Sequence, residues 1–137
     1  MVIPRDLKYS EDHTWLRIDG ERGIIGITDF AQSWLGDLLH IDLFEDGSEV
    51  EPQGLFGTLE TSKVSFELNS PVGGTIIKKN NKLAHHINLI NDEPYGGGWM
   101  IVLRMRNIRD LANLMDADAY KEYIHKSWGY TKKGIEE

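Results

Sequence analysis

Short β-forming segments separated by Gly and Pro turns are the feature that most limits the folds open to this sequence. These segments are rich in Val, Ile, Leu, Thr and Trp, and they occupy residues 14–18, 24–27, 38–44, 55–60, 75–78 and 99–105. Each turn brings a strand back against a neighbour, which is typical of small β-sandwiches and barrels. The sequence therefore predicts a mainly β fold in which helices are peripheral.

Two short helices are expected beside the strands. Thr28 or Asp29 begins the first, which Gly36 ends, and Asp29 with Gln32 has the spacing of a capping box. Asp116 can cap the second, whose apolar face consists of Tyr120, Tyr123 and Ile124. Residues 80–94 are expected to form a further short helix and loops.

Length and composition limit the classes of protein that fit. The 137 residues suit one domain, for which we expect residues 1–127, followed by a mobile tail at 128–137. The net charge of −7 argues against nucleic-acid binding, and the absence of cysteine excludes disulfides and thiolate metal sites. No apolar run is long enough to span a membrane, and the N-terminus lacks the pattern of a signal peptide, so we expect a cytoplasmic protein.

One lysine has an unusual setting. Lys63 lies between residues 55–60 and a second strand-like stretch that includes Phe66 and Leu68. The pattern predicts a β-hairpin that holds Lys63 out in water at its tip. Such a presentation suits an enzyme that must select a single amine for acylation.

The residues around Lys63 resemble the attachment motif of lipoyl domains. Glu60-Thr61-Ser62-Lys63 is similar to the Glu-Thr-Asp-Lys of those domains, and Ser70-Pro71-Val72-Gly73-Gly74 is similar to the Ser-Pro-Val-x-Gly that follows it. Biotin carriers usually have Met on both sides of the lysine, whereas this chain has Ser62 and Val64. The resemblance implies lipoate, linked as an amide to Lys63.

Nearly the whole chain resembles the H proteins of the glycine cleavage system. The similar segments are residues 9–15, 26–32, 35–37, 56–57, 60–63 and 89–101. The resemblance implies a barrel-sandwich hybrid with short flanking helices and a C-terminal helix. It also implies a carrier that shuttles a bound intermediate between partner enzymes and catalyses nothing itself.

Two departures from the family pattern bear on what this carrier would hold. Family members that cleave glycine usually have Glu where this chain has Thr14, and that Glu helps to hold a cationic aminomethyl group. They also have a small residue where this chain has Phe66. These departures favour a related group of H-like lipoate-binding proteins, which work in sulfur oxidation with a heterodisulfide-reductase-like complex. The alternatives are a glycine-cleavage carrier of the aminomethyl group and an interaction module without lipoate.

Six further residues are candidates for holding the lipoyl arm or for recognition by the lipoylating enzyme. They are Asp12, His13, Thr14, Glu60, Phe66 and Glu67. The expected partners are a lipoate ligase or lipoyl transferase, the sulfur-oxidation complex or the glycine-cleavage enzymes, and dihydrolipoamide dehydrogenase.

Other signals favour ordinary structural roles. His85 and His86 lack a spaced set of further ligands, so we predict no metal site. Trp15, Trp34 and Trp99 are expected in the core or at its edge.

Overall fold

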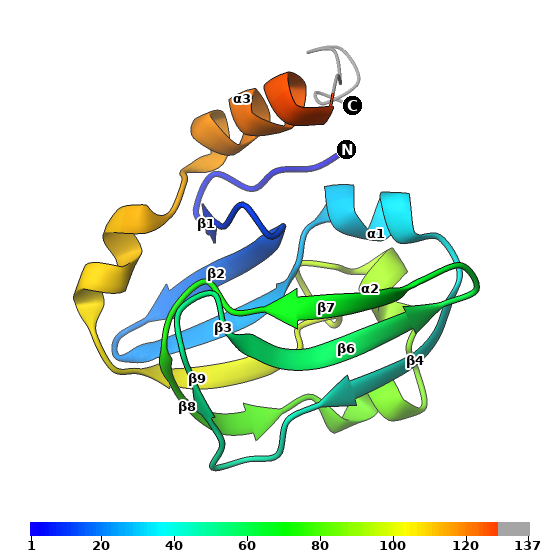
Figure 1. Cartoon of the computed structure of the whole chain (residues 1–137), viewed down its shortest axis with the longest axis horizontal. Coiled ribbons are helices and arrows are strands. Elements are labelled where there is room, and N and C mark those ends of the chain that lie inside the picture. The colour runs from blue at the N-terminus through cyan, green and yellow to red at the C-terminus, as the bar shows by residue number, and fades with distance from the viewer. Residues whose placement is uncertain (129–137) are drawn as a thin grey trace.

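The computed structural model describes residues 1–128 and consists of two antiparallel sheets with helices at their edges (Figure 1). The larger sheet has the strand order β1-β2-β3-β9-β8-β5, and the smaller one has the order β4-β6-β7. Trp128, the last residue of α3, is the only part of the expected tail at 128–137 that lies within the described residues.

The elements follow one another with short connections. The strands of the larger sheet are β1 (Lys8–Tyr9), β2 (Thr14–Asp19), β3 (Arg22–Ile27), β5 (Glu49–Val50), β8 (Gly74–Lys79) and β9 (Ile101–Met105). Those of the smaller sheet are β4 (Leu38–Leu43), β6 (Leu55–Thr61) and β7 (Ser65–Asn69). The helices are α1 (Asp29–Leu35), η1 (Asn81–Ala84), α2 (Leu89–Asp92), η2 (Ile108–Asn113) and α3 (Ala117–Trp128). None of the described helices is long and apolar enough to cross a membrane.

The main core lies between the two sheets. Alternate residues of β2 and β3 point inward from the larger sheet, and alternate residues of β6 and β7 meet them from the smaller one. Fully buried members are Leu16, Ile25, Ile27, Phe56, Leu59 and Leu68. The opposite, outer face of the smaller sheet is exposed to solvent.

A second core attaches helix α3 to the larger sheet. The rings of Tyr9 and Tyr120 stack with their centroids 4.6 Å apart, and Trp15, Phe30 and Ile124 are buried around them. Tyr9 and Met115 also exchange backbone hydrogen bonds of 2.8 Å. These contacts bring the N-terminal segment, α1 and α3 together at one end of the molecule (Figure 1).

The sequence predicts most of these elements and misses the shortest. Strands β1 and β5, with two residues each, and helix η2 carry no periodic pattern long enough to be recognised. The residue that caps α1 is Thr28, whose hydroxyl accepts a hydrogen bond from the Ala31 N–H, whereas Asp29 and Gln32 form a side-chain pair. Trp34 is 53% exposed, so its predicted place in the core or at its edge is wrong.

Gly26 provides a test of the packing in the larger sheet. A Cβ atom at this position would lie 2.7–2.9 Å from the Trp15 ring, which is held by a hydrogen bond from its Nε1–H to the Pro94 carbonyl. We therefore expect Gly26→Ala to lower the free energy of unfolding by about 1–3 kcal/mol, as overpacking usually does. Urea denaturation measures the change. Gly96→Ala is the control, because a Cβ there would meet nothing closer than 3.5 Å, and an equal loss in the two variants would contradict the account.

Candidate functional site

Lys63 lies at the tip of the hairpin formed by β6 and β7. Strand β6 ends at Thr61 and β7 begins at Ser65, so Ser62, Lys63 and Val64 make the connection. Lys63 is exposed. Its amine is therefore accessible to an enzyme, and the tip of the β6–β7 hairpin lies on a projecting edge of the molecule (Figure 1).

The hydroxyl of Thr61 fixes the conformation of this connection. Thr61 Oγ1 accepts hydrogen bonds from the N–H groups of Lys63 and Val64, at 3.1 and 2.9 Å. The Thr61 N–H donates to the Val64 carbonyl, and the Ser62 N–H donates to the Asp37 carbonyl at the end of α1. The lysine is therefore mounted on an ordered turn rather than on a flexible loop.

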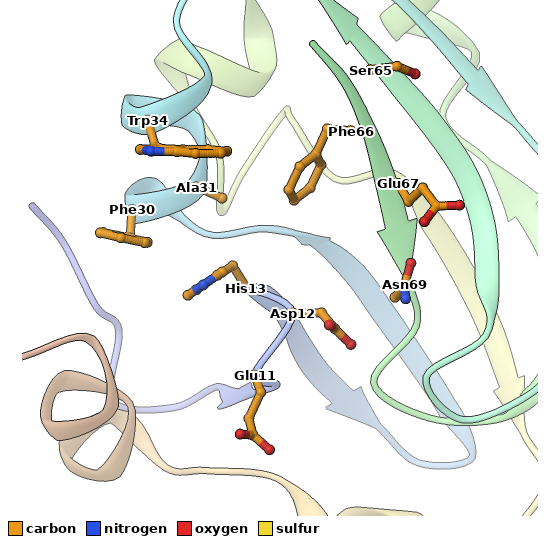
Figure 2. Close-up of a pocket in the computed structure, with 10 residues that line it drawn as sticks. All are labelled: Glu11, Asp12, His13, Phe30, Ala31, Trp34, Ser65, Phe66, Glu67 and Asn69. Carbon is orange, nitrogen blue, oxygen red and sulfur yellow. The ribbon is translucent and has the colours of Figure 1, made fainter. Parts of the chain in front are cut away.

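A cavity of about 410 Å³ lies beside the hairpin. Helix α1, the turn between β1 and β2, and strand β7 form its walls (Figure 2). The lining residues are Glu11, Asp12, His13, Phe30, Ala31, Trp34, Ser65, Phe66, Glu67 and Asn69. Since Phe66 follows Lys63 by three residues, the tip of the hairpin and the cavity are close enough to act as one site.

The walls of the cavity combine apolar and acidic groups. Figure 2 shows Trp34 of α1 and Phe66 of β7 on opposite sides of it. Three carboxylates border it, from Glu11, Asp12 and Glu67. Partial burial, and then the neighbouring charge of Glu11, raise the pKa of Asp12. A cation in the cavity would offset both effects, so the site is suited to a long apolar chain that ends in a positive charge.

Thr14, one of the residues predicted for the arm groove or for recognition by the lipoylating enzyme, does not line this cavity. Its side chain is completely buried at the start of β2. Its hydroxyl lies 2.7 Å from Ser10 Oγ and donates to the Asn69 carbonyl at 3.1 Å. A pattern of matching residues could not reveal this, because the direction of the side chain depends on the turn that precedes it.

The other candidates divide between the cavity and its surroundings. Asp12, His13, Phe66 and Glu67 line the cavity, whereas Glu60 lies on the exposed face of the smaller sheet. Glu67 sits at the border, with its carboxylate turned away from α1 (Figure 2). The sequence did not identify Trp34 as a residue of the cavity. Its position four residues after Phe30 is as typical of a buried helix face as of a helix face that lines a cavity.

His13 connects the cavity with the second core. Its Nδ1 lies 2.8 Å from the Tyr120 hydroxyl, which in turn lies 2.7 Å from Thr28 Oγ1. The backbone of His13 has a φ of 65°, a left-handed conformation that is uncommon outside Gly but in which Asn, Asp and His are enriched. Burial lowers the pKa of His13 from 6.5 to about 4, so the ring is neutral at physiological pH.

Two packed antiparallel sheets with a lysine at a hairpin tip are the barrel-sandwich hybrid of the lipoyl and biotinyl carriers. A sequence profile described as glycine cleavage H-protein matches residues 7–127. The chain belongs to the glycine cleavage H-protein family.

Similar proteins support this assignment over nearly the full length of the chain. The glycine cleavage system H protein of Carboxydothermus hydrogenoformans is 40% identical over 125 residues, which cover 91% of this chain and 96% of that protein. The H protein of Halalkalibacterium halodurans is 43% identical over 122 residues, 89% of this chain and 95% of that protein. The crystal structure of the H protein from Mycobacterium marinum is similar with a TM-score of 0.80 at 30% identity, covering 92% and 99% of the two chains.

These relatives favour the glycine-cleavage alternative over the predicted role in sulfur oxidation, for which the comparisons give no support. The prediction relied on two departures, Thr14 as a missing carboxylate in the arm groove and Phe66 in place of a small residue. Thr14 is buried away from the cavity and three carboxylates border it, so the first departure does not remove negative charge from the site.

The lowered pKa of His13 predicts a specific dependence of stability on pH. Below pH 6.5 the unfolded chain takes up a proton on His13 that the folded protein rejects until about pH 4, so stability falls as the pH is lowered through this window. We expect wild type to lose about 3 kcal/mol more than His13→Asn between pH 7 and pH 4. Asn tolerates the positive φ, and the acidic groups that the two proteins share cancel in the comparison. Parallel stability curves from urea denaturation would contradict the assignment.

Proposed function

We propose that this chain is a lipoate carrier of the glycine cleavage system, with lipoate attached to Lys63 and an aminomethyl group as its cargo. The observation that carries the proposal is the exposed lysine on an ordered hairpin tip, directly beside an acidic and aromatic cavity, in a chain of this family. The chain supplies attachment and shelter, and the chemistry takes place on its partner enzymes. Those partners are the glycine-cleavage enzymes and the enzyme that attaches lipoate.

Attachment begins at the Lys63 amine. Its nitrogen, after loss of a proton, attacks the carbonyl carbon of an activated lipoate such as the acyl adenylate. The N–C bond forms, the C–O bond to the phosphate breaks, and AMP leaves with the electron pair. The amide removes the positive charge of Lys63. It also keeps the attached group at an effective concentration of about millimolar near the cavity.

The cavity residues then define what the site can hold. Lipoate, when bound, supplies a dithiolane that alternates between disulfide and dithiol and can hold a one-carbon amine. Trp34 and Phe66 cover an apolar chain and its sulfur atoms, which pack well against aromatic rings. Asp12 and Glu11 place negative charge at the border of the cavity, where they compensate a cationic amine. These groups support the aminomethyl cargo.

The attachment site is tested by intact-mass measurement. Incubation with a lipoate ligase, ATP and lipoate should add one lipoyl group to wild type and to the control Lys82→Arg. It should add none to Lys63→Arg, because Arg keeps the charge without an acylatable amine. A chain that stays unmodified in wild type would instead favour the alternative of an interaction module without lipoate.

The cargo is tested by removal of the Asp12 charge. In glycine-dependent NADH formation with purified glycine-cleavage enzymes, we expect lipoylated Asp12→Asn to be at least about tenfold less effective than wild type. A charged hydrogen bond of about 1.5–3 kcal/mol accounts for this factor.

Asp19→Asn is the matched control, since Asp19 is exposed at the far end of β2 and remote from the cavity. Equal rates for wild type and Asp12→Asn would contradict the proposed role of the carboxylate. A wild type that forms no NADH would contradict the glycine-cleavage function itself.

A further inference from the structure

The outer face of the smaller sheet carries features that the cavity does not explain. Strands β4, β6 and β7 form one layer in front of the larger sheet (Figure 1). Residues that alternate with the buried Leu59 and Leu68 point outward from this layer. They form two rows across the strands, Asp42–Thr58–Glu67 and His40–Glu60–Ser65.

This face is acidic, and its carboxylates take part in no ion pair within the part of the chain that the structure describes. Asp42, Glu60 and Glu67 are exposed, and none of the ion pairs formed within residues 1–128 includes them. Glu60 lies diagonally across the strands from both Asp42 and Glu67, a spacing of about 7–8 Å. The three carboxylates therefore concentrate negative charge next to the hairpin tip that carries Lys63.

An apolar side chain interrupts the acidic surface close to Lys63. The register of β4 against β6 shifts between Leu38, which pairs with Thr61, and His40, which pairs with Glu60. Leu39 has no partner across the strands, and the bulge leaves its side chain 64% exposed instead of in the core. Val64, beside the lysine itself, is 47% exposed. The exposed Leu39 and Val64 side chains together offer apolar area that a partner surface can cover.

We infer that this outer face is the docking surface for the enzyme that acylates Lys63. The inference rests on the proposed attachment of lipoate. An enzyme that uses an acyl adenylate must hold a phosphate at its active site, so the entrance to that site presents Arg or Lys side chains. Asp42, Glu60 and Glu67 complement such an entrance, and Leu39 fills an apolar recess beside it.

The position of the face relative to the cavity supports this partner over the enzymes that act on the loaded arm. The cavity opens between α1, β7 and the β1–β2 turn, and Phe66 points into it from the opposite face of the sheet to Asp42 and Glu60, which do not line it. An enzyme docked on the outer face reaches Lys63 without entering the cavity. The acylating enzyme meets the chain before any arm exists, and can recognise only the protein surface around the lysine.

The test measures initial rates of Lys63 acylation by a purified lipoate–protein ligase against the concentration of the unmodified chain, with intact mass as the readout. Leu39→Gln should raise KM at least about fivefold with kcat unchanged, which corresponds to about 1 kcal/mol of lost contact. Asp42→Asn should raise KM about threefold in low salt, and the effect should disappear near 0.5 M NaCl.

Matched controls separate docking from general effects. Ile108→Gln removes an apolar side chain on η2 that is more exposed than Leu39, at 78%, and Asp19→Asn removes a charge on the other sheet, so both should leave KM unchanged. Unchanged KM in both Leu39→Gln and Asp42→Asn would overturn the inference. A second outcome would also overturn the inference: Leu39→Gln is acylated normally, but once lipoylated it shows a raised KM in glycine-dependent NADH formation. The face would then be the docking surface for a glycine-cleavage enzyme. Failure of the wild type to be acylated would remove the proposed function itself.

Discussion

The hydrogen bonds of Thr61 determine where Lys63 is presented, and the rest of the site is arranged around that position. The Thr61 hydroxyl accepts hydrogen bonds from the N–H groups of Lys63 and Val64. Strand β6, which ends at Thr61, pairs with β4 on one side and with β7 on the other. Thr61 is buried, so water competes little for these bonds. The result is a single orientation of the hairpin tip, with the cavity on one side and the acidic outer face on the other.

The cavity depends on contacts that are distant in sequence. Its floor includes His13, which meets Tyr120 of α3 and lies close to Phe30 of α1, with ring centroids 5.0 Å apart. Helix α3 therefore supports the wall that carries Glu11 and Asp12, although none of its side chains at residues 117–127 lines the cavity. A neutral His13 suits this place, since a buried imidazolium would have to be compensated by the same carboxylates that are available to a cationic cargo.

Most of the fold and the lysine could be predicted from sequence because they follow from local patterns. Alternating apolar residues between turns predict the strands, and the attachment motif places Lys63 on a hairpin. The cavity could be predicted only in part. Thr14 follows His13 directly, yet one side chain lines the cavity and the other is buried against Asn69. That difference arises from the positive φ of His13 and from packing against β7, which no single segment encodes. The exposure of Trp34 and Leu39 likewise depends on strand pairing and helix packing.

The hydrogen bonds of the hairpin and the packing around the cavity predict that both are already formed before lipoate is attached. Amide chemical shifts of the 15N-labelled chain, measured before and after lipoylation of Lys63, test this most directly. The predicted result is a set of changes confined to residues 62–64 and to the cavity segments around Asp12, Trp34 and Phe66. Changes spread through the buried strands, at Leu16, Ile25 and Leu103 for example, would show that the attached group completes the core and would contradict the account. Changes at the hairpin tip alone would contradict the assignment of the cavity to the arm.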